Sequence, residues 1–189
     1  LVKSKKLASA QRVTSWKDLP ESFGSPATKE IVNEFGEPTW NFAEENHGWF
    51  VVDTARTKLF SGFVTKPCAF DGMTLDIGKT NLGWATVSLV KAKGLAATDA
   101  KNGKLSKGSY LLTATGDMHN TGAVRQTTAG DAITTAGQYQ GDSGTAPILL
   151  EGIPATISLN SVRANRVEVY ALDESGARAQ KLDVKAFAG

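Results

Sequence analysis

The nine residues "WATVSLVKA" (84–92) decide the fold class of this chain. Apolar and polar side chains alternate along them, which is the period of two that an extended strand requires. Ala85, Val87 and Leu89 fall on one face of such a strand, and the opposite face begins with Trp84 and carries hydroxyl side chains. The pattern predicts a strand with one buried and one solvent-facing side, as antiparallel sheets commonly have.

Strand patterns of the same kind recur on both sides of this stretch. They lie at 48–55, 108–116 and 155–160, and we expect a hairpin over 166–187 around the turn "DESGA". Clusters of Gly, Asn, Asp and Ser separate these patterns, and short strands between such turns are typical of sandwiches and barrels. The sequence therefore predicts an all-β protein, an antiparallel β-sandwich of jelly-roll-like architecture with at most one short helix.

The first part of the chain has a different character. Residues 1–28 are polar and irregular, so we expect a linker or a draped N-terminal segment there, followed by a single β-sandwich domain over 29–189. The stretch "TKEIVNEF" (28–35) is the only one that favours a helix, of about two turns, with Thr28 as its cap.

Composition narrows the functional classes. The net charge of +2 comes from 21 basic and 19 acidic side chains without a concentrated basic cluster, which argues against a nucleic-acid partner. Cys68 is the only cysteine, so we expect neither an intrachain disulfide nor a cysteine metal cluster.

No apolar run approaches the ~18 residues of a membrane helix, so we expect no membrane partner. We expect no cofactor, with a structural calcium ion as the one open alternative. The chain begins with Leu, and we expect it to be a mature product or part of a longer polypeptide.

A long segment without strand pattern, residues 120–147, contains the tetrad GDSG at 141–144. In chymotrypsin-like serine proteases this tetrad surrounds the nucleophile, which needs a histidine base and a carboxylate. Neither His47 nor His119 has the flanking residues of that protease family, so Ser143 lacks an evident base. We interpret the tetrad as loop-forming residues and keep a small hydrolase only as the least favoured alternative.

A more extended likeness lies elsewhere. "IVNEFGEPTWN" (31–41) followed by "GWFVVDTARTKLFSGF" (48–63) resembles a β-rich, non-catalytic module of bacterial multimodular glycoside hydrolases. Stretches at 108–124, 146–159 and 167–184 resemble the later strands and closing hairpin of the same module, in the same order. The chain departs from the family where Thr54-Ala55-Arg56 replaces the frequent Thr-Pro-Arg, and in the loop "LVKAKGLAATDAKNGK", where the family often has a Leu-Asp-Gly turn. The positions that carry the first likeness are Ile31, Gly36, Glu37, Trp40, Asn41, Phe50, Val52, Asp53, Thr54, Arg56 and Gly62.

The resemblance implies a non-catalytic carbohydrate-binding module. Such a module targets a secreted or cell-surface glycoside hydrolase to a plant-type polysaccharide (β-glucan, mannan or xylan), and its partners are that polysaccharide and the parent catalytic domain. The main alternative is a structural appendage that packs against the catalytic domain without binding sugar. A packing appendage is expected to have a contiguous apolar patch, whereas a binding module is expected to have separated aromatic rings among polar groups.

Sugar binding without catalysis needs exposed aromatic rings, because the apolar face of a pyranose stacks on them. Trp49 is out of phase with Phe50 and Val52, so if those two face the core, Trp49 faces the other side. Trp84 faces solvent by the alternation described above. We expect a structural role for Trp40.

Two further aromatic residues lie outside the expected strands. Tyr139 is flanked by glutamines in the long segment 120–147, and Trp16 lies in the polar N-terminal segment. The predicted carbohydrate-binding residues are therefore Trp49, Trp84, Tyr139 and Trp16.

Overall fold

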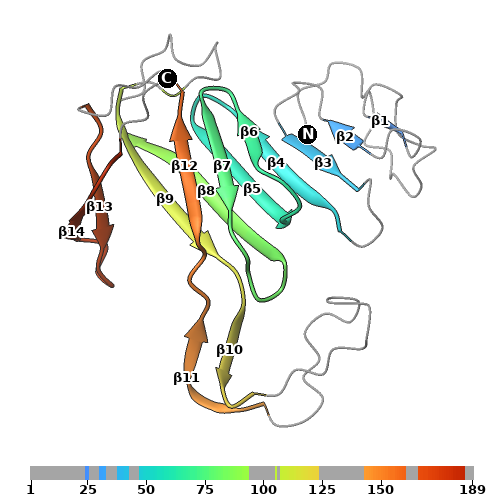
Figure 1. Ribbon diagram of the computed structural model, residues 1–189, viewed down its shortest axis with the longest axis vertical. Helices are drawn as coiled ribbons and strands as arrows, with labels where there is room; N and C mark the ends of the chain where they lie inside the picture. The colour runs from blue at the N-terminus through green and yellow to red at the C-terminus, as the bar shows by residue number, and fades with distance from the viewer. Residues whose placement is uncertain are drawn as a thin grey trace, which may run out of the picture.

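The structure is a computed structural model that describes residues 24–25, 30–32, 38–42, 47–93, 105, 107–123, 143–160 and 166–185. These residues form antiparallel strands and contain no α-helix, which confirms the predicted all-β, sandwich-like architecture (Figure 1). A search of the same residues for a helix long and apolar enough to cross a bilayer finds none.

The strands are short, from two residues in β1 to ten in β8. They are β1 (Gly24–Ser25), β2 (Glu30–Val32), β3 (Pro38–Asn41), β4 (Trp49–Asp53), β5 (Thr57–Phe63), β6 (Cys68–Phe70), β7 (Met73–Ile77), β8 (Trp84–Lys93), β9 (Ser109–Thr115), β10 (Met118–Thr121), β11 (Thr145–Leu150), β12 (Ala155–Leu159), β13 (Val169–Leu172) and β14 (Arg178–Leu182).

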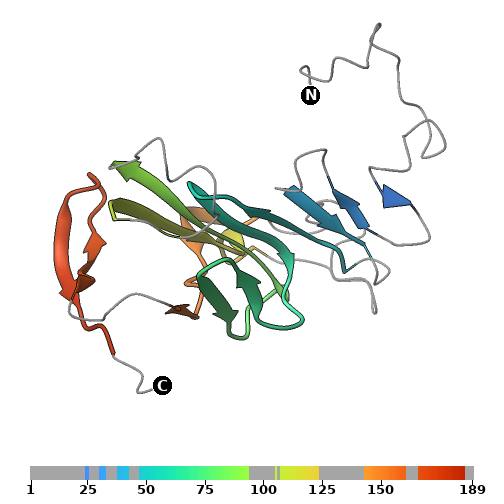
Figure 2. The ribbon, with the colours of Figure 1, turned by 90° about the horizontal axis from the view of Figure 1, so that it is seen from above.

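Two sheets of unequal size form the body of the molecule. The large sheet has seven strands in the order β1-β2-β3-β4-β5-β8-β9, and the small sheet has three in the order β12-β7-β6. Figure 2 shows the small sheet on one side of the large sheet only. The hairpin β10–β11 projects from the body as an arm, and the hairpin β13–β14 lies beyond β9 (Figures 1 and 2).

The hydrophobic core lies between the two sheets. The face of the large sheet that contributes to it is called the inner face here, and the opposite one the outer face. Strand alternation explains the core, because β5 and β7 bury every second residue. The apolar set predicted for β8, namely Ala85, Val87 and Leu89, also points inward. The buried core residues are Val51, Phe60, Phe70, Met73, Leu75, Ile77, Ala85 and Val87.

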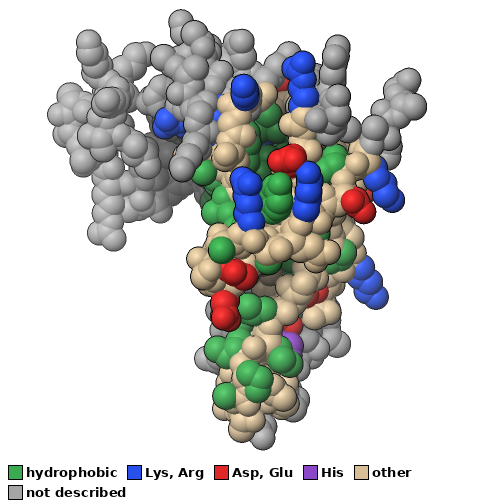
Figure 3. Space-filling model, turned by 90° about the vertical axis from the view of Figure 1, so that its left-hand side faces the viewer, with side chains coloured by type: hydrophobic (Ala, Val, Ile, Leu, Met, Phe, Trp, Pro, Cys, Tyr) green, Lys and Arg blue, Asp and Glu red, His purple; other side chains and the backbone are tan. Residues whose placement is uncertain are grey.

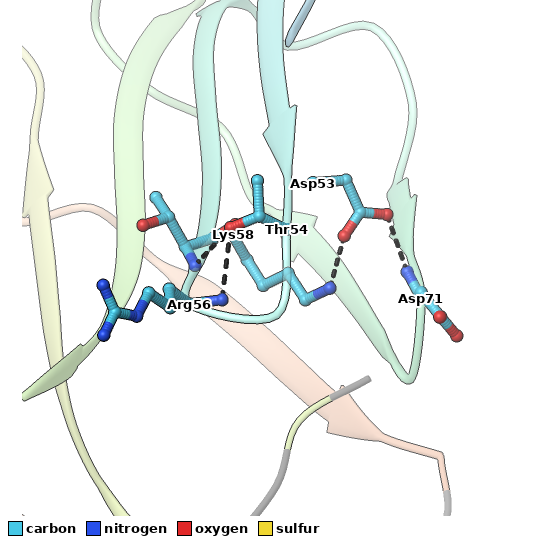
Figure 4. Close-up of polar contacts among 6 residues, drawn as sticks. Asp53, Thr54, Arg56, Lys58 and Asp71 are labelled. Carbon is cyan, nitrogen blue, oxygen red and sulfur yellow. Dashed lines mark hydrogen bonds and ion pairs between the residues drawn. The ribbon is translucent and has the colours of Figure 1, made fainter. Parts of the chain in front are cut away.

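A polar contact ties the two sheets together at the turn between β4 and β5 (Figure 4). Asp53 pairs with Lys58 directly across this hairpin, and the Lys58 side chain is fully buried. The other carboxylate oxygen of Asp53 accepts a hydrogen bond of 2.8 Å from the Asp71 backbone N–H, in the turn between β6 and β7. The hydroxyl of Thr54 accepts hydrogen bonds from the backbone N–H groups of Arg56 and Thr57, which fixes the turn itself.

The helix predicted at 28–35 is not present in the described part of that stretch. Residues 30–32 form β2, which pairs with β3 through Ile31 and Trp40. A helix of two turns gains few hydrogen bonds for its nucleation cost, whereas the β-branched pair Ile31-Val32 suits a sheet. Residues 24–25, assigned from the sequence to the N-terminal segment, form β1 at the edge of the same sheet.

Candidate functional site

The outer face of the large sheet has an unusual composition. Cross-strand partners point to the same side of a sheet. The register therefore places Trp40, Phe50, Ser61, Thr86 and Thr115 in one row across the outer face. Among the described residues, no second sheet covers this side (Figure 2). The register gives these outward positions on the large sheet: Ile31, Pro38, Trp40, Phe50, Val52, Thr57, Leu59, Ser61, Phe63, Trp84, Thr86, Ser88, Val90, Leu111, Thr113 and Thr115.

Aromatic rings gather at one end of the outer face, where β3, β4, β5 and β8 lie side by side. Trp40 is 49% exposed and pairs across the strands with Phe50, which is 37% exposed. Phe63 pairs in the same way with Trp84 on β8. These four residues, with Phe42 and His47, are called the aromatic patch.

Edge-to-face contacts hold four of the six rings of the aromatic patch in place. The rings of Trp40 and Phe42 lie 5.8 Å apart at an interplanar angle of 61°. The rings of His47 and Phe63 lie 4.7 Å apart at 63°. Gly48 lets the chain pass close to β3, since a Cβ atom built on it would lie 2.9 Å from the Asn41 carbonyl oxygen. The patch therefore combines fixed rings with exposed ring surface.

Hydroxyl groups continue the outer face beyond the aromatic patch. Ser61 and Thr86 share a hydrogen bond of 2.7 Å between their hydroxyl oxygens, and Ser88 and Thr113 share another of 2.7 Å. Each hydroxyl has both donor and acceptor capacity, so a pair bonded to itself still offers further hydrogen bonds to a polar ligand. These pairs are called the hydroxyl ladder.

Charged side chains of the same strands lie on the inner face. The register places Glu30, Asp53, Lys58 and Lys91 there, on the side of the small sheet. None of the described outward positions carries an acidic or basic residue. This distribution reverses the usual one, in which the solvent-facing side of an antiparallel sheet is the polar one.

The two tryptophans predicted from the sequence to face solvent, Trp49 and Trp84, lie on opposite faces of the large sheet. Trp84 does lie on the outer face, opposite in phase to buried Ala85. The orientation predicted for Trp49 is wrong, because Val51 is buried while Phe50 is exposed, and Trp49 packs against the core. Four consecutive apolar residues, 49–52, leave the phase of β4 undetermined until its pairing with β5 is known.

Trp40, for which a structural role is expected, lies on this face and is 49% exposed. Tyr139 and Trp16 lie outside the described residues. Sequence reasoning missed Phe50 and Phe63 as surface residues. Alternation in "TKLFSGF" was the available signal for Phe63, because Leu59, Ser61 and Phe63 share one side.

The described half of the GDSG tetrad has a structural role. Gly144 has φ +71° at the start of β11, and a Cβ atom there would lie 2.6 Å from the Thr121 carbonyl oxygen. The Ser143 carbonyl accepts a hydrogen bond of 3.0 Å from the Asn120 side chain. His119 Nδ1 lies 3.4 Å from an Asp117 carboxylate oxygen, but no hydrogen bond joins His119 to the Ser143 hydroxyl.

The described residues outside the outer face include one cysteine, Cys68. Burial raises the pKa of the Cys68 thiol to about 11, with the nearby Asp53 carboxylate acting in the same direction. A thiol with a raised pKa is a poor nucleophile. The parts of the chain that the structure describes contain no group of three or more His, Cys, Asp or Glu side chains suited to a metal ion.

Comparison with protein-family models, with curated proteins and with solved structures gives no match for this chain.

Proposed function

We propose that this protein is a non-catalytic carbohydrate-binding module of a secreted glycoside hydrolase, and that the outer face of its large sheet binds a plant-type polysaccharide. The observation that carries the proposal is the aromatic patch, with Trp40 and Phe50 exposed side by side on an open sheet face. The family resemblance of the sequence supports the same function. β-Glucan, mannan and xylan are the candidate ligands.

The physical basis of binding is stacking of pyranose rings on exposed aromatic rings. Aromatic side chains contribute large contact areas, and they lose little conformational entropy because few of their bonds rotate. Edge-to-face contacts hold Trp40 and Phe63 before any ligand arrives, which lowers the ordering cost of binding. Hydroxyls of the hydroxyl ladder supply hydrogen bonds beside the rings. Few such contacts support an affinity on the order of micromolar or weaker.

The decisive experiment is affinity electrophoresis of the protein through gels that contain soluble β-glucan, glucomannan or arabinoxylan. Trp40→Ala and Phe50→Ala remove exposed rings, so each is expected to weaken retardation about tenfold, the equivalent of roughly 1.4 kcal/mol. Leu111→Ala is the matched control, because Leu111 is 44% exposed on the same face but lies outside the aromatic patch. It is expected to leave binding unchanged.

Two outcomes would contradict the proposal. The first is no retardation by any of the polymers together with no pull-down on insoluble cellulose or mannan. The second is retardation that Leu111→Ala weakens as much as Trp40→Ala does, which would remove the aromatic patch from the argument. Circular dichroism of each variant shows whether its fold is retained.

A second function has an observation of its own. Apolar side chains are exposed along the arm β10–β11, and Figure 3 shows hydrophobic side chains gathered over it. Met118, Ile148 and Leu150 are 58%, 59% and 72% exposed. Exposed apolar patches of this kind mark protein contacts, so a structural appendage that docks on a catalytic domain is the alternative. Replacing Ile148 and Leu150 by Ser would then abolish docking and leave polysaccharide binding unchanged.

A further inference from the structure

The separation of charge between the two faces of the large sheet bears on the class of polysaccharide. On the large-sheet strands β2, β3, β4, β5, β8 and β9, the structure describes the side chains of four charged residues. All four lie on the inner face, namely Glu30, Asp53, Lys58 and Lys91. The side chain of Lys93, at the end of β8, is outside the described residues. The outward positions carry only aromatic, aliphatic and hydroxyl side chains.

An acidic sugar would meet no Lys or Arg side chain at the described outward positions of this face. Proteins recognise carboxylate, sulfate and phosphate groups with Arg and Lys, because these side chains offer charged donors to the anion. A carboxylate moved from water onto rings and hydroxyls without a cation loses hydration that nothing replaces. A neutral hydroxyl loses less and finds donors and acceptors in the hydroxyl ladder.

From this geometry we infer that the outer face selects uncharged polysaccharides over acidic ones of the same backbone. The inference rests on the proposed function and deepens it, since it names the chemical class of the ligand. The net charge of the whole chain, +2, acts in the opposite direction. Neutral selectivity is therefore a property of the face and not of the protein as a whole.

The test compares polymers that differ in charge but not in backbone. Hydroxyethyl cellulose is compared with carboxymethyl cellulose, and arabinoxylan with glucuronoxylan, by affinity electrophoresis and by isothermal titration. Ionic strength is held near 0.15 M, where a Debye length of about 8 Å suppresses the attraction between a weakly basic protein and a polyanion. We expect the neutral member of at least one pair to bind at least about tenfold more tightly.

A charge added to the face tests the cause of the selectivity. Thr115 is exposed, faces outward and pairs with Thr86. Thr115→Lys is expected to raise affinity for the acidic polymer severalfold and to narrow the difference within the pair. Gln180→Lys, on the exposed strand β14, is the control with the same net charge, and it is expected to change neither affinity.

The outcomes separate the two proposals. Binding to no member of any pair contradicts the carbohydrate-binding function itself. Equal binding to both members, or tighter binding to the acidic member, leaves that function standing and overturns neutral selectivity. If Thr115→Lys and Gln180→Lys raise affinity for the acidic polymer equally, the gain comes from the net charge of the protein and not from the outer face. This outcome also overturns the inference.

Discussion

Lys58 is a charged residue in a place that normally excludes charge. Its side chain is fully buried beside the core, and its ammonium group contacts the Asp53 carboxylate, which is 31% exposed. Transfer of an ammonium group out of water is unfavourable unless a partner compensates for it. Asp53 therefore stabilises the fold chiefly by compensating a charge that is already buried.

This asymmetry leads to a prediction about the two partners. Asp53→Asn leaves the buried ammonium group without its counter-charge and is expected to lower the free energy of unfolding by about 3 kcal/mol. Lys58→Met removes the buried charge and keeps the apolar stem, so its cost is expected to stay within about 1 kcal/mol. Urea denaturation followed by tryptophan fluorescence measures both. Equal costs would show that the pair acts as a simple surface salt bridge.

Cys68 gives a prediction about pH. Burial raises the pKa of the thiol to about 11 in the folded protein, which is above its ordinary value. The folded state therefore favours the neutral thiol, and this contribution is complete below the ordinary pKa and is lost as the pH rises toward 11.

Cys68→Ala isolates this effect from the titration of lysines and tyrosines. We expect the stability advantage of the wild type over Cys68→Ala to shrink between about pH 9 and pH 11, measured by urea denaturation at each pH. Alkylation by iodoacetamide at pH 8 should also be slow until the protein unfolds. An advantage that is constant over this range would contradict the raised pKa.

At the scale of elements, alternation predicted where strands lie better than which way they face. The stretch at 84–92 became β8, and the hairpin at 166–187 became β13 and β14 around the turn at Asp173. The phase of β4 failed because both faces of 49–52 are apolar. Trp40 and Phe50 could not be recognised as neighbours, since their proximity depends on the register between β3 and β4.

The arm β10–β11 gives a prediction for a pair of glycines. Gly144 and Gly122 both have positive φ, at +71° and +74°, but only Gly144 is crowded. Gly122→Ala is expected to cost about 1 kcal/mol of arm stability from backbone strain alone. Gly144→Ala adds a clash with the Thr121 carbonyl oxygen, so its cost should be clearly larger.

Amide hydrogen exchange resolves this local effect, since an arm can open without global unfolding. Faster exchange at β10 and β11 in Gly144→Ala than in Gly122→Ala is the expected result. Similar rates in both variants would mean that the arm moves to accommodate the extra methyl group.

For the whole molecule, the sequence predicted the sandwich-like fold because alternating strand patterns and turn residues are local signals that recur along the chain. The sequence did not predict that the small sheet is narrower than the large one, because that depends on which distant strands pair. The candidate site lies on the large sheet, and it could be predicted only in part for the same reason. Trp84 was found from local alternation, and alternation also held a signal for Phe63, whereas the pairing of Trp40 with Phe50 needed the sheet order.

The hairpin β13–β14 gives a prediction about independence within the chain. Its strands pair only with each other, and neither contributes a residue to the core described above. Removal of residues 166–189 is therefore expected to change the free energy of unfolding of the sandwich by less than about 1 kcal/mol. Denaturation of the shortened chain measures this, with deletion of β12 as the disruptive comparison. A large loss of stability would mean that the hairpin packs on the body.

The pairing of β12 with β7 has a consequence for the order of events during synthesis. Leu75 leaves the ribosome long before Ile157, its partner across the two strands. Until the later strand arrives, one edge of β7 and the apolar side chains of Met73 and Leu75 have no cover on that side, and exposed strand edges are sites of self-association. Closure of the core is therefore a late and non-local step, which slows folding. A chain that ends before residue 155 is expected to aggregate, whereas one that ends after 160 can close.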